Sequence, residues 1–151
     1  MWSKLLITVV MLSTTLLGGC ATTASYQAKA VNRYDGAFIR GWQSGTFLYW
    51  TLTYTEIEKV DGLPLSRSSQ VGGVLVDPGL RVLSVAGTYG RGSGRDTGKV
   101  ELDVTLKAGH SYRVKAERNG ERMTLWVEDE AANEVVSEKR STTTTHWIKW
   151  F

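Results

Sequence analysis

The sequence predicts an all-β protein, a single antiparallel β-sandwich of about seven strands that follows an N-terminal targeting segment. Three observations support this fold class. Several short segments alternate apolar and polar residues with the two-residue period of a β-strand. Turn-forming residues separate these segments roughly every 11 to 16 residues, which is typical of a sandwich. No segment beyond the N-terminus has a long apolar pattern at helical spacing.

The composition excludes several classes of protein. The chain has 151 residues, of which 42% are hydrophobic and 22% charged, with 2 Pro and 1 Cys. These values exclude a disordered chain, a collagen-like repeat and a small fold held by disulfides. The formal net charge is +3 and the basic residues are scattered, so no nucleic-acid partner is expected. One globular domain behind a targeting segment remains.

The targeting segment covers residues 1–20. Lys4 supplies a positive charge, the apolar stretch Leu5–Leu17 follows, and Leu17-Gly18-Gly19-Cys20 ends it. This tetrapeptide resembles the bacterial lipobox, which implies cleavage before Cys20 and acylation of its thiol and new amino group. The residue at position 21 is Ala rather than Asp, which implies sorting to the outer membrane. The alternative is a membrane anchor or ordinary signal peptide with a chance cysteine.

Three regions are therefore expected: a signal peptide at 1–19, a polar lipidated tether at 20–35 and a β-sandwich domain at 36–151. Within the domain, Phe47–Val60 is rich in aromatic and β-branched residues, and its apolar pattern changes phase. That change predicts a bulge or a break. Two short strands, Val71–Val76 and Leu80–Ala86, are expected on either side of the turn Asp77-Pro78-Gly79.

The clearest strands follow. Lys99–Lys107, Ser111–Glu117 and Arg122–Glu128 each place apolar residues on one face. Asn119-Gly120 predicts a tight hairpin with both residues at positive φ, and a loop is expected at Ala131-Ala132-Asn133. The predicted inward-facing residues of these strands are Val100, Leu102, Val104, Leu106, Tyr112, Val114, Ala116, Met123, Leu125 and Val127.

Turn and strand spacing over residues 54–136 suggests a family. The pattern consists of Val60-Asp61-Gly62, Val76-Asp77-Pro78-Gly79 with Leu83 and Val85, and Ala108-Gly109 before Tyr112 and Val114. It resembles small bacterial outer-membrane lipoproteins with PEGA-like or transthyretin-like sandwich domains, most of which have no assigned activity. The resemblance implies a fold and carries no reactive residue.

Catalytic and metal-binding patterns are weak. His110 and His146 are 36 residues apart, and Cys20 would be consumed by lipid, so neither a metal nor a cofactor is expected. His110 is interpreted as an exposed turn residue. The run Glu128-Asp129-Glu130 is interpreted as a solvated loop, and no catalytic triad spacing is present. The protein is therefore predicted not to be an enzyme.

The segment Gly87–Gly98, GTYGRGSGRDTG, does not match a phosphate-binding loop, because Gly98-Lys99 is followed by Val100. A flexible hairpin loop is favoured. The alternative is a ligand loop in which Arg91 and Arg95 meet carboxylate or phosphate groups.

The C-terminus TTTTHWIKWF contains Trp147, Trp150 and Phe151. Burial in a closing strand is favoured, because bulky aromatic side chains usually pack inside. A contact with a partner protein or a membrane surface is the alternative.

These expectations together predict a non-enzymatic lipoprotein at the outer membrane that faces the periplasm. Lipid on Cys20 would hold it to the membrane, and its domain would serve as an interaction or structural module with an envelope protein partner. The alternative is a binding module for an envelope glycan or anionic ligand through the loop at 87–98.

Overall fold

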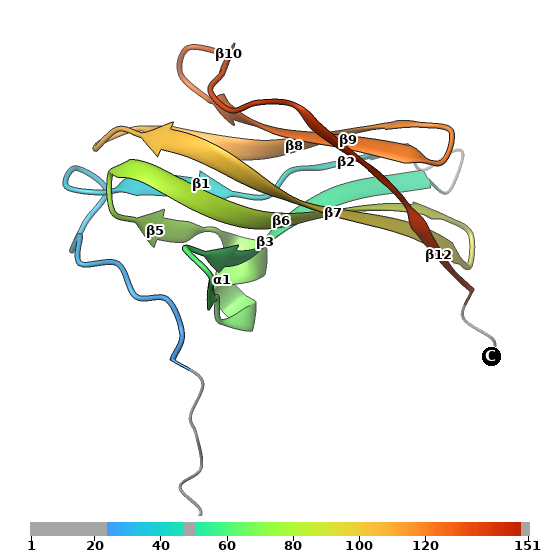
Figure 1. The fold of residues 1–151 in the computed structure, drawn as a ribbon, viewed down its shortest axis with the longest axis horizontal. Coiled ribbons are helices and arrows are strands. Elements are labelled where there is room, and N and C mark those ends of the chain that lie inside the picture. Colours follow the sequence, from blue (N-terminus) through green and yellow to red (C-terminus); the bar gives the residue numbers. More distant parts are fainter. Residues whose placement is uncertain (1–23, 47–50, 149–151) are drawn as a thin grey trace, which may run out of the picture.

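The computed structural model describes residues 24–46 and 51–148. Two sheets pack face to face with the hydrophobic core between them (Figure 1), so the all-β fold class is confirmed. The described residues form twelve strands rather than about seven. The difference arises because several strands are pieces of two to four residues, and because two bends split what would otherwise be continuous strands.

The first sheet has the order β10-β9-β8-β1-β5, and β11 also pairs with β9. Its strands are β1 (Ala37–Arg40), β5 (Val74–Val76), β8 (Ser111–Asn119), β9 (Arg122–Asp129), β10 (Glu134–Val135) and β11 (Arg140–Thr143). The expectation of a purely antiparallel sandwich was wrong, because β1 runs parallel to β8. A parallel pair needs a long crossover connection, and here the connection contains most of the second sheet.

The second sheet has the order β12-β7-β6-β3-β2, and β4 pairs with β3. Its strands are β2 (Gln43–Thr46), β3 (Thr51–Val60), β4 (Leu63–Pro64), β6 (Gly79–Arg91), β7 (Gly94–Leu106) and β12 (Thr145–Ile148). The register of β3 against β6 shifts between Ile57 and Lys59, which confirms the predicted bulge.

A short helix replaces the start of one expected strand. Helix α1 (Arg67–Gly72) occupies part of the segment predicted as a strand from Val71 to Val76, and only Val74–Val76 is extended. Ser66 caps the helix, because its side chain accepts a hydrogen bond from the Ser69 amide. No helix in the described parts of the chain is long and apolar enough to cross a membrane.

The core consists of the inward-facing residues of both sheets, as the two-residue period predicts. Leu102, Val104, Tyr112, Val114, Met123, Leu125 and Val127 are each no more than 1% exposed, and Leu106 and Ala116 are also buried. Val100 is partly buried against this cluster. The predicted inner faces of β7, β8 and β9 are confirmed.

Two of the places where the chain crosses between the sheets are bends between strands that would otherwise be continuous. At Gly41 it passes from β1 to β2, and a Cβ there would lie 2.0 Å from the Thr55 carbonyl oxygen. Thr55 Oγ1 accepts a hydrogen bond from the Trp42 amide at 2.7 Å and donates one to the Val114 carbonyl, at 2.8 Å, on the opposite sheet. Near Thr144 the chain passes from β11 to β12, and its amide donates to the Glu121 carbonyl. Bends of this kind form the corners of a sandwich.

Two hairpins differ from their predicted form. Asn119 pairs with Arg122, so the turn residues are Gly120 and Glu121, and only Gly120 has a positive φ, at 61°. The hairpin is confirmed, but the expectation that Asn119 also takes positive φ was wrong. The expected loop at 87–98 is mostly strand, because β6 continues to Arg91 and β7 starts at Gly94. The predicted loop at 131–133 is confirmed.

The segment before the domain lies on the domain. The Tyr26 amide donates to the Pro64 carbonyl at 2.9 Å. Asp77 Oδ1 accepts hydrogen bonds from the amides of Lys29 and Ala30 at 2.8 and 2.9 Å. The region expected to be a tether through residue 35 is therefore held in place from Tyr26 onward.

Candidate functional site

The first candidate is a histidine–carboxylate pair at one end of the sandwich. His110 Nδ1 and Asp129 Oδ2 are 2.6 Å apart. Burial alone would raise the pKa of Asp129, but the His110 side chain and the amides of Ala132 and Ala131 donate to it and lower that pKa overall. The two residues meet because Asp129 lies opposite Tyr112, two residues after His110, across the β8–β9 pair. Sequence spacing alone did not reveal this partner for His110.

Glu130, next to Asp129, is also engaged. Arg40 contacts it through Nε and Nη2 at 2.7 and 3.1 Å, and Arg113 Nε donates at 2.9 Å. Burial would raise the pKa of Glu130, and these two guanidinium groups lower it overall. The expectation that residues 128–130 form a solvated run was wrong for Asp129 and Glu130, because each is bound by partners on neighbouring elements. Their carboxylate oxygens accept hydrogen bonds from residues of neighbouring elements.

The second histidine belongs to a polar cluster at the opposite end. His146 Nδ1 lies 2.5 Å from Asp96 Oδ1, and Arg118 Nη2 lies 2.7 Å from Asp96 Oδ2. The Arg118 guanidinium carbon is 4.5 Å from the centre of the Tyr89 ring. Asp96 therefore joins β12 and β7 of one sheet to β8 of the other. These contacts link strands of the two sheets to each other.

Within the described residues, neither histidine pair has the further neighbours from which a catalytic triad or a metal site is built. No hydroxyl or thiol group there is hydrogen-bonded to either imidazole. No group of three His, Cys, Asp or Glu residues in the same part of the chain is placed to hold a metal ion. A histidine–aspartate pair can orient a general base, but without a nucleophile beside it this geometry favours no particular reaction.

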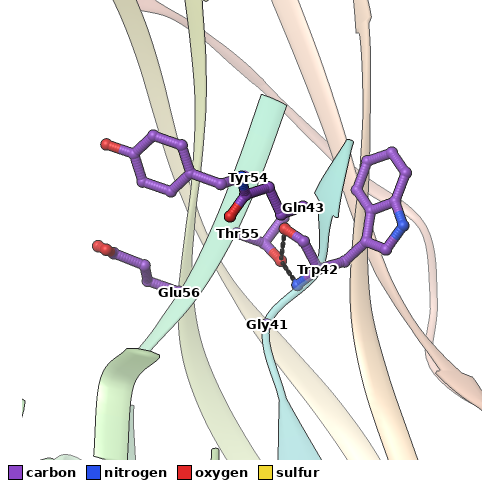
Figure 2. Close-up of a pocket in the computed structure, with 6 residues that line it drawn as sticks. All are labelled: Gly41, Trp42, Gln43, Tyr54, Thr55 and Glu56. Atoms are coloured by element: carbon purple, nitrogen blue, oxygen red, sulfur yellow. Dashed lines mark hydrogen bonds between the residues drawn. The ribbon is translucent and has the colours of Figure 1, made fainter. Parts of the chain in front are cut away.

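A hollow lies at the bend between β1 and β2. It is lined by Gly41, Trp42, Gln43, Tyr54, Thr55 and Glu56. Figure 2 shows that Tyr54 and Glu56 project to one side of β3 while Trp42 points to the other. Trp42 is covered by Lys115, whose Nζ lies 4.7 Å from the ring centre. Since the side chains diverge and Thr55 is used in the crossing, the hollow has no convergent polar groups to bind a ligand.

Arg91 and Arg95 do not act together. Arg91 lies opposite Gly94 and Arg95 lies opposite Gly90 in the β6–β7 hairpin. Opposed residues share a face and successive residues alternate, so the two side chains project from opposite faces of the sheet. The ligand loop that the sequence suggested contains both residues, and this register places them on different faces, where they do not converge on one anion.

The C-terminal segment forms strand β12, which carries Trp147. Residues 145–148 form a strand, as expected, and pair with β7. Trp147 is nevertheless 66% exposed, so its predicted burial was wrong. His146 lies opposite Asp96 and turns its side chain to that face of the strand, although this side chain is itself 56% exposed. Trp150, Phe151 and Cys20 lie outside the described residues.

Trp147 belongs to a row that crosses the outer face of the second sheet. It lies opposite Arg95, Arg95 lies opposite Gly90, and Gly90 lies opposite Leu52. We call these four residues the C-terminal row. Arg95 is exposed and Leu52 is 37% exposed. This row places an aromatic, a cationic and an aliphatic side chain on one solvent-exposed face.

Comparison of the chain with protein-family models, with curated proteins and with solved structures found no match.

Proposed function

We propose that this protein is a non-enzymatic lipoprotein of the outer membrane whose β-sandwich acts as an interaction module. Lipid on Cys20 holds it to the membrane, and the domain faces the periplasm, where it contacts an envelope protein. The anchoring part of the proposal is supported by the charged start, apolar stretch and lipobox-like ending of residues 1–20. The acyl chains on the Cys20 thiol and amino group provide more than the two membrane-binding signals that stable anchoring requires.

The interaction part depends on one observation, the exposure of Trp147 in the C-terminal row. Tryptophan and arginine are the residues most often found at the energetic centre of protein interfaces. Trp147 is 66% exposed beside exposed Arg95. In addition, β12 ends the strand order of its sheet, and such an edge can pair with a strand of another chain.

The anchoring part is tested with Cys20→Ser in the full-length protein. The variant should remain as uncleaved precursor and lose acyl labelling, because the thiol that accepts lipid is absent. Processing to the same size together with equal partitioning into detergent would show that the lipobox interpretation is wrong.

The interaction part is tested by photo-crosslinking in intact cells from a probe placed at Thr145, beside Trp147 on the same face. Trp147→Ala should abolish a discrete crosslinked product. Val135→Ala, which removes an exposed apolar side chain from β10, should leave it unchanged. A product unaffected by Trp147→Ala would exclude the C-terminal row as the contact.

A second candidate function is binding of an envelope glycan or other anionic ligand. The C-terminal row favours Arg95 with Trp147, rather than Arg91 with Arg95, as its contact. Isolated envelope polysaccharide should then bind the wild-type protein and bind Arg95→Gln several-fold more weakly, with Arg91→Gln as the matched control. Equal loss in both variants would point to general charge instead.

A further inference from the structure

We infer that the end of the sandwich around Asp77 lies against the phospholipid surface that holds the lipid anchor. This inference rests on the lipidation of Cys20 in the proposed function. It adds a specific orientation and a specific contact surface. We call the surface the anchor end and define it by Lys29, Val31, Arg33, Tyr34, Leu80 and Lys107.

The anchor end is where the N-terminal segment is fastened. The Asp77 side chain accepts hydrogen bonds from the amides of Lys29 and Ala30. In addition, the Asp77 amide donates a hydrogen bond to Tyr26 Oη at 3.1 Å. The Gly109 amide donates to the Gly36 carbonyl at 2.9 Å. Figure 1 shows this segment running along the side of the molecule where β5 and α1 lie.

Fastening the segment shortens the tether. A chain spans at most about 3.5 Å per residue. From Cys20 to Gly36, sixteen residues apart in the sequence, the reach would be about 56 Å. From Cys20 to Tyr26, six residues apart, it is about 21 Å. The part of the domain that holds Tyr26 must therefore stay within about 21 Å of the lipid headgroups, about half the length of β6.

Exposed apolar side chains gather at this end. Val31 is 89% exposed, Tyr34 is 88% exposed and Leu80 is 69% exposed. Leu80 follows Gly79, which pairs with Leu106 at the end of β7, and the Tyr34 carbonyl lies close to Gly109 just beyond that strand. Large exposed apolar residues have a cost in water that insertion between headgroups removes. The short tether brings them to that position.

The charges fit the same surface. Lys29, Arg33 and Lys107 are exposed, and no ion pair of theirs occurs within the described parts of the chain. Arg33 lies over the Phe38 ring at 3.8 Å, which holds its guanidinium at the surface. Cations beside apolar side chains suit the headgroup layer of a phospholipid membrane.

The test uses the lipidated full-length protein with one added cysteine as the site of a fluorescent label. Tyr34→Cys and Leu80→Cys report on the anchor end. Ser93→Cys is the matched control, because it lies in the turn that follows Arg91, and Arg91 lies twelve register positions from Gly79 along β6, about 40 Å away. The protein is placed in vesicles of phosphatidylethanolamine and phosphatidylglycerol that carry nitroxide-labelled lipids. Quenching at positions 34 and 80 should exceed that at 93 by about threefold or more.

Tyr26→Phe combined with Asp77→Ala removes the acceptor of the Lys29 and Ala30 amides and the Tyr26 hydroxyl. It should loosen the segment and reduce the quenching at position 80, because the tether then reaches further. A circular dichroism melt checks that this variant is folded. Equal quenching at all three positions, or stronger quenching at position 93, would overturn the inference. Mass spectrometry of the N-terminal peptide is measured on the same samples. An unacylated peptide would refute the proposed function itself, whereas an acylated protein without differential quenching would refute only the orientation.

Discussion

Replacing Gly87 by alanine distinguishes two explanations for the glycines of residues 87–98. As part of a flexible loop, Gly87 could be replaced without harm, and the change would stabilise the protein by about 0.4–1 kcal/mol through the unfolded state. In the structure Gly87 lies in β6, opposite Gly98 in β7, and its φ is not positive. Backbone conformation therefore does not require glycine here.

Space requires it instead. A Cβ at Gly87 would lie 2.4 Å from Met123 Sδ and 3.2 Å from Leu125 Cδ2. Both neighbours are fully buried in the opposite sheet, so neither side chain can move into solvent. Overpacking of this kind costs about 1–3 kcal/mol. At about 4 °C for each kcal/mol in a domain of this size, the melting temperature should fall by about 4–12 °C. The two explanations thus predict opposite signs.

The assay is thermal unfolding of residues 24–151 followed by circular dichroism. Gly90→Ala is the matched control, because it lies in the same strand and its Cβ would meet nothing closer than 3.7 Å. In a Met123→Ala background, the Gly87→Ala change should cost about 1 kcal/mol less, since the obstructing sulfur is gone. A Gly87→Ala protein as stable as wild type, with no coupling to Met123, would refute the packing argument.

Three further predictions concern stability. Gly120→Val should lower the free energy of unfolding by about 1 kcal/mol or more, because φ at this position is positive. No atom lies within 4 Å of a Cβ built at this position, so backbone conformation alone causes the loss, and an unchanged melting temperature would contradict the turn geometry. The pKa of Asp129 is lowered in the folded protein, so its stabilising contribution is present above the ordinary carboxyl pKa and is lost as the pH falls through the lower folded value. Urea titrations between about pH 6 and pH 2 should show this loss, Asp129→Asn should be less stable at neutral pH and flatter below pH 5, and an unaltered slope would contradict the assignment. Truncation after Thr145 should lower the melting temperature but keep unfolding cooperative, because the buried cluster lies earlier in the chain; loss of cooperativity would show that β12 is needed for folding.

Local pattern predicted the parts of the fold that depend on neighbours in sequence. The inner faces of β7, β8 and β9 could be predicted because burial on one side of a sheet imposes a two-residue period. The bulge in β3 left its mark as a phase change in the same period. The glycines of residues 87–98 were misinterpreted because a glycine needed for close packing and one needed for a turn look alike in a sequence. Only the approach of Met123 from a distant strand separates the two cases.

Pairs that form between neighbouring strands of one sheet could not be predicted from the sequence for a related reason. His110 meets Asp129 and His146 meets Asp96 through strand register, which sequence spacing does not specify.

The position of Trp147 shows the consequence, since it shares a strand with His146 and successive residues face opposite sides. The contact with Asp96 turns the His146 side chain toward the Asp96 side of the strand, and Trp147 must then point to the other side. Exposure of the tryptophan therefore follows from the polar cluster, and this gives a test of the proposed contact. His146→Leu should weaken the seating of β12 and also the crosslink that depends on Trp147, whereas Val135→Ala should affect neither. A crosslink that persists after β12 is loosened would mean that the contact does not require the strand.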